Sequence, residues 1–106
     1  VTVRISRTHS PETVAQFQWA QRHGYPRVLT IDRRGAAERR KRSLAGIPTR
    51  PGKQRDEYPP AMSVENAGRA HVRLIDATDN ARSGSSMGSQ LARYCDGTKF
   101  RLVAAP

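Results

Sequence analysis

Apolar residues recur with two different periods along this chain, and the two periods predict two kinds of element. Alternation of apolar and polar residues is typical of half-buried strands, whereas an apolar residue at every third or fourth position is typical of helices. The expected strands are 1–5, 28–31, 54–58, 71–75 and 99–104. The expected helices are 11–23, 36–45 and 87–94, and the polar segment 78–86 is expected to be a loop.

The order of these elements predicts a single small α+β domain that spans residues 1–106. Strands and helices are interspersed without an internal repeat, and a chain of this length can bury only one modest hydrophobic core. The second half forms a strand–loop–strand–helix unit over about 54–94. No stretch approaches the roughly 20 apolar residues that span a bilayer, so no membrane partner is expected.

The charge balance points to a polyanionic partner. The chain has 19 Lys and Arg against 9 Asp and Glu, which gives a net charge of +10. Nine of the 19 cations lie between Arg33 and Arg55, where Glu38 is the only acid. A field of this sign attracts nucleic acid, and the guanidinium groups that dominate it match phosphate oxygens in pairs. High arginine content can also simply confer solubility, but the clustering favours nucleic acid.

The chain has one cysteine, Cys95, and begins at Val1 without an initiator methionine or an apolar leader. A single cysteine excludes an intrachain disulfide and a cysteine-based zinc cluster. We expect Cys95 to be a small core residue rather than a catalytic thiolate, because no histidine partner lies near it in the sequence. The start of the chain leaves two contexts open, a removed export signal or a domain excised from a longer protein.

Phosphodiester hydrolysis needs a group that takes a proton from water, a divalent ion, and cations that hold the backbone. Asp56 and Glu57 form an acidic pair beside Arg55, and Asn80 comes ahead of the last expected helix. A carboxylate and a carboxamide are hard oxygen ligands that suit Mg²⁺ or Mn²⁺. Taken alone, an acidic pair is more typical of a solvated surface, and such an asparagine is more typical of a turn or helix cap.

A longer motif changes that balance. Residues 47–62 have the sequence IPTRPGKQRDEYPPAM, which resembles the signature GIPTxPGxDRDE[YW]PxAM of the NucA/NucB deoxyribonucleases. Asp79-Asn80, Gln90-Leu91 and the run 96–98 are similar to the second half of that family, and the resemblance covers roughly residues 3–103. It implies a secreted, monomeric endonuclease that cuts DNA without sequence specificity, with RNA left open as a substrate.

The resemblance also implies a ββα-metal, or His-Me finger, core with one divalent ion, Mg²⁺ or Mn²⁺. Asp56 and Asn80 would bind the ion, and Glu57 would act as the general base, although the reverse assignment of the two carboxylates stays open. Gln90 would orient Asn80 or a water. The expected phosphate-binding residues are Arg55 and Arg82 near the site and Arg39, Arg40, Lys41 and Arg42 on the basic helix.

Two departures from the family pattern keep other hypotheses open. Gln54 stands where the family has an acid, and the loop after Asn80 places its arginine, Arg82, differently. The chain is therefore also compatible with a basic nucleic-acid-binding module that has lost turnover. A third hypothesis is the nuclease tip of a larger bacterial toxin, delivered to its target and held in check by an acidic immunity protein.

Overall fold

The computed structural model describes all residues from Val1 to Pro106 and gives five strands, three α-helices and one 3₁₀ turn. In chain order they are β1 Thr2–Ser6, α1 Pro11–Arg22, β2 Leu29–Thr30, α2 Ala36–Leu44, β3 Lys53–Tyr58, the 3₁₀ turn η1 Val64–Asn66, β4 His71–Asp76, α3 Ala77–Leu91 and β5 Lys99–Ala105. The predicted α+β class is confirmed. No helix has the length and apolar character that crossing a membrane would require.

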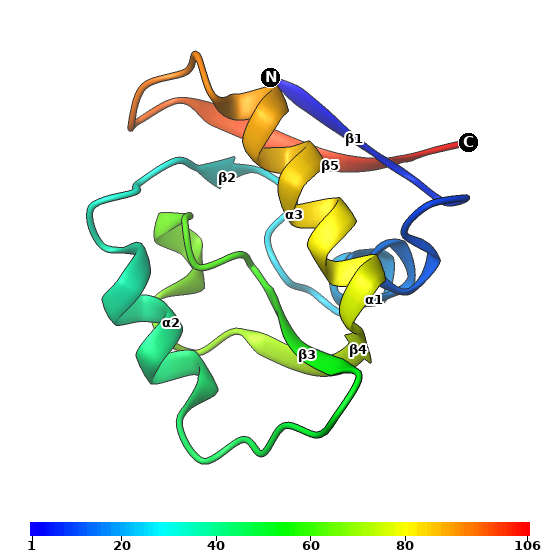
Figure 1. Ribbon diagram of the computed structural model, residues 1–106. Helices are drawn as coiled ribbons and strands as arrows, with labels where there is room; N and C mark the ends of the chain where they lie inside the picture. Colours follow the sequence, from blue (N-terminus) through cyan, green and yellow to red (C-terminus); the bar gives the residue numbers. More distant parts are fainter.

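The strands form two separate sheets (Figure 1). In the first, β5 lies between β1, to which it is parallel, and β2, to which it is antiparallel. In the second, β3 pairs with β4 alone in antiparallel register, with Asp56 opposite Arg73. Helix α3 continues directly from β4 and passes beside β1, so it links the two sheets. The second edge of β3 therefore has no strand beside it.

One hydrophobic core lies between the first sheet and helices α1 and α3. Alternation buries Val3 and Ile5 of β1 and Phe100 and Leu102 of β5 on the same side of the sheet. Residues at helical spacing on α1, with Phe17 at their centre, cover that side. Burying such a set of large side chains, at roughly 2 kcal/mol each, holds the two sheets in a fixed relation.

The prediction of a loop over 78–86 is wrong, because α3 begins at Ala77 and continues through this serine- and glycine-rich segment. The side chain of Asp76 caps the helix by accepting a hydrogen bond from the backbone N–H of Asp79 at 3.0 Å. Tertiary contacts supply the rest, since Met87 packs on the core and Leu91 is buried within it. Cys95 is also not in the core but exposed.

Helices α1 and α3 cap one another where they meet. The Asp79 carboxylate, which is buried, accepts hydrogen bonds from the backbone N–H groups of Glu12 at 2.7 Å and Thr13 at 3.1 Å. In return, the Glu12 carboxylate accepts one from the backbone N–H of Asp76 at 3.0 Å. These exchanges satisfy N–H groups that a helix start leaves without partners. They also fix the first turn of α3, which carries Asn80.

Candidate active site

A cavity of about 280 Å³ lies along the unpaired edge of β3. Its polar wall comes from β3, from α2 and from the first half of α3. The charged or polar residues that line it are Arg40, Arg55, Asp56, Glu57, Asn80, Thr13 and Ser83. Its floor is apolar and belongs to the hydrophobic core, with Phe17 and Leu102 among the lining residues. Acidic, amide and cationic groups therefore meet beside a surface that excludes water.

Asp56 and Glu57 both line this cavity although they are neighbours on one strand. Side chains of neighbouring strand residues point to opposite faces of a sheet. The Glu57 side chain lies toward α2, where it pairs with Arg40, whereas Asp56 shares its face with Gln54. Because no strand covers this edge of β3, groups from both faces can reach the same space.

Asp56 lies in an environment that disfavours its charged form. Burial and, to a lesser extent, the nearby carboxylates of Asp79 and Glu57 together raise the pKa of its carboxyl to about 7, against the opposing charge of Arg73. A carboxylate held this way gains from any cation placed beside it. Such perturbed groups are more frequent at functional sites than elsewhere on proteins.

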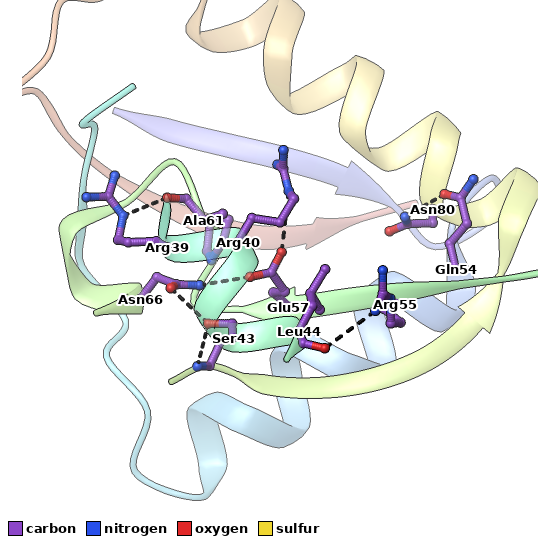
Figure 2. A network of polar contacts seen from close by, with 12 residues as sticks. Arg39, Arg40, Ser43, Leu44, Gln54, Arg55, Glu57, Ala61, Asn66 and Asn80 are labelled. Atoms are coloured by element: carbon purple, nitrogen blue, oxygen red, sulfur yellow. Dashed lines mark hydrogen bonds and ion pairs between the residues drawn. The ribbon is translucent and has the colours of Figure 1, made fainter. Parts of the chain in front are cut away.

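Glu57 is held by two partners. Its Oε1 lies 3.6 Å from Nε of Arg40, and its Oε2 accepts a hydrogen bond from Nδ2 of Asn66 at 3.2 Å (Figure 2). Only 7% of the Glu57 side chain is exposed, against 60% for Arg40. Burial raises the pKa of the Glu57 carboxyl, and the Asn66 hydrogen bond and the Arg40 charge oppose this rise. The two contacts thus fix the carboxylate in place, and Arg40 is the partner that is exposed to solvent.

Asn80 lies in the first turn of α3 rather than in a loop. Its Nδ2 donates a hydrogen bond to Oε1 of Gln54 at 2.7 Å, which joins the helix to β3 (Figure 2). That bond uses the amide nitrogen and leaves the carboxamide oxygen available. Gln54, the departure from the family pattern, therefore orients the predicted ligand by accepting this bond.

The available oxygen donors fit a hard cation with few protein ligands. No group of three or more His, Cys, Asp and Glu side chains is placed so that it could hold a metal ion, which excludes a closed cage of such ligands. Asp56 and the Asn80 carboxamide oxygen offer one charged and one neutral ligand. Mg²⁺ and Mn²⁺ suit such a site, because Mg²⁺ in particular is usually held by one or two carboxylates, waters and substrate phosphate.

The predicted phosphate-binding arginines and lysine have different environments. Arg40 and Arg55 line the cavity, and Nη1 of Arg55 is anchored by a 2.9 Å hydrogen bond to the carbonyl of Ile47. Lys41 is exposed on the outer side of α2, in a shallow groove next to Arg55. Arg82 is exposed in a separate groove between α3 and the β1–α1 turn, so the structure does not bring it to the cavity.

The other two arginines of the basic helix have intramolecular partners. Arg39 donates from Nε to the carbonyl of Ala61 at 2.8 Å and from Nη1 to the Asp32 carboxylate at 2.9 Å, with 15% of its side chain exposed. Arg42 pairs with Glu38 one turn away at 3.1 Å on the helix surface. Arg39 is therefore a structural clamp, contrary to its expected role. Arg42 stays exposed, and surface pairs of this kind are weak.

Gln90 does not lie in the cavity. Its Oε1 accepts from the backbone N–H of Arg4 at 2.9 Å, and its Nε2 donates to the carbonyl of Arg4 at 2.8 Å. Ten residues of helix separate it from Asn80, which is about 15 Å along the axis. The side chain instead satisfies the open edge of β1, so the structure contradicts the expected role in orienting Asn80 or water.

Two residues of the site were missed by sequence reasoning. In the sequence Gln54 is recognisable only as a lost acid, and Asn66 is not singled out. For Gln54, its alternation with Asp56 on one strand was a usable signal, because it places both side chains on one face. For Asn66 no local signal existed, since its bond to Glu57 depends on how the β3–β4 connection folds.

Comparison with known proteins gives consistent results. The family model described as Deoxyribonuclease NucA/NucB matches residues 17–103, which include every residue of β3, β4 and α3. A protein named "DNA-entry nuclease" from Bacillus subtilis (strain 168) is 45% identical over 98 residues. That alignment covers 92% of this chain and 67% of the relative.

Proposed function

This chain belongs to the NucA/NucB family of deoxyribonucleases, and on that premise we propose that it is a metal-dependent endonuclease that hydrolyses DNA at the cavity beside β3. The observation that carries the proposal is the meeting of Asp56, Glu57 and Asn80 in one cavity with Arg40 and Arg55. The β3–β4 pair followed by α3 gives the strand order of a ββα-metal core, with candidate ligands on the first strand and the helix.

In this proposal Asp56 and Asn80 hold one divalent ion, Mg²⁺ or Mn²⁺. When bound, the ion supplies positive charge for the scissile phosphate and the leaving oxygen. Asn80 is neutral, so the pair adds only one negative charge beside a substrate that is itself anionic. Gln54 keeps the Asn80 carboxamide oriented through the 2.7 Å hydrogen bond to its amide nitrogen.

Glu57 takes the proton from the attacking water. Burial raises the pKa of its carboxyl, which makes the ionised form a stronger base than an exposed glutamate. The side chains of Glu57 and Asp56 lie on opposite faces of β3, so the Glu57 carboxylate is kept apart from the Asp56 carboxylate that binds the ion. This separation favours Glu57 over Asp56 as the general base. Its 3.6 Å pairing with Arg40 provides a cation at the point where the phosphate would enter.

Arg40 and Arg55, which line the same cavity as Glu57, bind the DNA backbone. The anchored Nη1 of Arg55 leaves its other guanidinium N–H groups for phosphate oxygens. Arg40 is largely exposed and can pair with phosphate while its stem stays beside Glu57. Lys41 and Arg42 extend the cationic surface of α2, which adds contacts that do not depend on base sequence. The site is complete within one chain, which supports a monomeric enzyme.

Nicking of supercoiled plasmid DNA tests the proposal. The parent protein should convert the plasmid to open circles with Mg²⁺ or Mn²⁺ and stop when EDTA is added. Asp56→Asn and Glu57→Gln should each slow nicking by about 10²–10⁴-fold, while Glu38→Gln, an exposed acid on α2, should not. A parallel assay on RNA of the same sequence measures the preference between the two substrates.

Two results would overturn the proposal. If nicking persists in EDTA, the enzyme does not depend on a metal ion. If both acid variants nick the plasmid at the parental rate, the active site does not lie at Asp56 and Glu57. Tight DNA binding by a parent protein with no turnover under any divalent ion would instead support the binding-module hypothesis.

A further inference from the structure

Asn66 is a buried amide that contacts the candidate base and has every polar atom engaged. It lies at the end of η1, and 1% of its surface is exposed. Its Nδ2 donates to Oε2 of Glu57 at 3.2 Å and to the carbonyl of Pro59 at 2.7 Å. Its Oδ1 accepts from Oγ of Ser43 at 3.0 Å and from the backbone N–H of Gly68 at 2.9 Å.

These four contacts leave the amide one orientation. Two donors, from Ser43 and Gly68, face Oδ1, so a flipped amide would place its own N–H groups against them. The amide nitrogen must then face Glu57. A buried amide with all partners satisfied is rigid, because loss of any one contact leaves an unpaired polar group that has lost its hydration as well.

Ser43 connects this amide to the basic helix. It is buried on the inner face of α2, one turn after Arg40, and its Oγ also accepts a hydrogen bond from the backbone N–H of Ala70 at 3.1 Å. Figure 2 shows the resulting chain of contacts from Ser43 through Asn66 to Glu57, with Arg40 on the second oxygen of the carboxylate. The helix that binds the DNA backbone and the carboxylate that acts on water therefore share one buried network.

We propose that Asn66 is a positioning residue for DNA hydrolysis, which fixes Oε2 of Glu57 so that Oε1 is presented to the cavity beside Arg40. The inference rests on the proposed function of Glu57. A glutamate side chain has several rotatable bonds, and an error of about 1 Å in a reacting group can cost about 10²-fold in rate. Arg40 alone cannot supply this precision, because its side chain is 60% exposed.

A structural role for the same network must be separated from a positioning role, since loss of Asn66 also leaves the Pro59 carbonyl and the Gly68 N–H unpaired. The separating measurement is a double-mutant cycle with Glu57. A residue that acts through Glu57 loses its effect on turnover when Glu57 has no carboxylate, whereas a residue that only stabilises the fold affects both backgrounds alike.

The experiment measures kcat and KM on linear duplex DNA with Mn²⁺ for Asn66→Ala and Ser43→Ala, each in the parent and in Glu57→Ala. In the parent, Asn66→Ala should lower kcat by roughly 10–100-fold, with KM and the Mn²⁺ Kd within about twofold. Ser43→Ala, which leaves Asn66 in place, should lower kcat by about threefold to tenfold. In Glu57→Ala, both effects should shrink to less than about twofold.

Ser63→Ala is the matched control. Ser63 is fully buried in the same connection and donates to the carbonyl of Pro60 at 2.8 Å, without a contact to Glu57. It should lower the melting temperature and leave kcat unchanged. If Asn66→Ala does not fold, Ser43→Ala decides the question in the same cycle.

The inference fails if Glu57→Ala is strongly impaired and Asn66→Ala or, failing that, Ser43→Ala reduces kcat equally in both backgrounds. It also fails if Asn66→Ala folds and keeps the parental kcat. A Glu57→Ala protein with parental turnover is a different result, because it refutes the base assignment in the proposed function.

Discussion

Replacing Asp56 by asparagine should abolish DNA cleavage in the presence of metal and should make the metal-free protein more stable. The carboxylate is buried near Asp79 and Glu57, and this environment raises its pKa to about 7. The folded state therefore binds more protons than the unfolded state between about pH 4 and pH 7. Because the folded state binds more protons, the free energy of unfolding falls as pH rises through that window. Above pH 7 the folded protein carries the full cost of ionising the buried Asp56 carboxyl.

The size of this penalty follows from the pKa. Each pKa unit corresponds to about 1.4 kcal/mol, so a rise from 3.8 to about 7 corresponds to about 4 kcal/mol at pH 8. At pH 5 the same linkage gives about 2 kcal/mol, because the folded carboxyl is still protonated there. Asparagine has the same shape and no charge, so Asp56→Asn should gain about 2–3 kcal/mol over the parent between pH 5 and pH 8.

Calorimetric melting in EDTA at the two pH values measures this difference. For a domain of this length, 1 kcal/mol shifts the melting temperature by about 4–8 °C, so the advantage of Asp56→Asn should grow by roughly 8 °C or more from pH 5 to pH 8. Asp96→Asn, at an exposed carboxyl paired with Arg33 far from the cavity, is the control and should show no such growth.

A stability difference that is the same at the two pH values would contradict this prediction, as would an Asp56→Asn protein that is less stable than the parent at pH 8. Either result would mean that the surroundings of Asp56 do not destabilise its ionised form in the folded protein. A divalent ion would then have no destabilised charge to relieve at this position.

Three further predictions concern the residues around the cavity. Asn80→Ala should raise the Mn²⁺ Kd on the order of tenfold, or about 1.4 kcal/mol, whereas Asn80→Asp should bind Mn²⁺ at least as tightly as the parent but cleave DNA more slowly. Equal Mn²⁺ titrations for both variants would mean that Asn80 is not a metal ligand. Arg40→Ala should reduce the slope of log K for DNA binding against log salt concentration by about 0.9, whereas Arg39→Ala should keep this slope and lose about 1–3 kcal/mol of folding stability. The reverse pattern in salt titrations would contradict the assignments of the two arginines. Gln90→Ala should melt earlier than the parent and nick plasmid at the parental rate, and a large loss of turnover at unchanged stability would restore its predicted role.

Much of the fold could be predicted because local pattern and tertiary structure agree. The strands predicted from alternation over 1–5 and 71–75 and the helix predicted over 11–23 all match the observed elements within a residue or two. In these segments the side chains that are apolar in the sequence are the ones that the core requires. The sequence pattern and the packing therefore favour the same conformation.

Helix α3 could not be predicted over its first half because composition and tertiary structure disagree. The segment 81–89 is rich in Ser and Gly, which are poor helix formers. Burial of Leu91 and mutual capping with α1 outweigh this propensity. A signal was nevertheless present, since Asp76 followed three residues later by Asp79 is a helix-start pattern.

The candidate site was predictable in its residue types but not in its geometry. Asp56 and Glu57 follow from the motif and Asn80 from the resemblance beyond it, and the structure brings all three to one cavity. That two strand neighbours reach one cavity depends on the missing partner at the edge of β3, which no local pattern reveals. Arg39 and Arg40 are adjacent in one basic run but differ in role, because Arg39 pairs with Asp32 and Arg40 pairs with Glu57. The sequence does not show which arginine faces which acid.

We propose that the cavity beside β3 binds a divalent ion between Asp56 and Asn80. Anomalous diffraction from a crystal soaked with Mn²⁺ tests it most directly. We expect one strong peak in the cavity, with an Asp56 carboxylate oxygen and the Asn80 carboxamide oxygen as its protein ligands, and no peak in a crystal of Asp56→Asn. A peak bound elsewhere, or a cavity without a peak in an enzyme that nicks DNA with Mn²⁺, would contradict it.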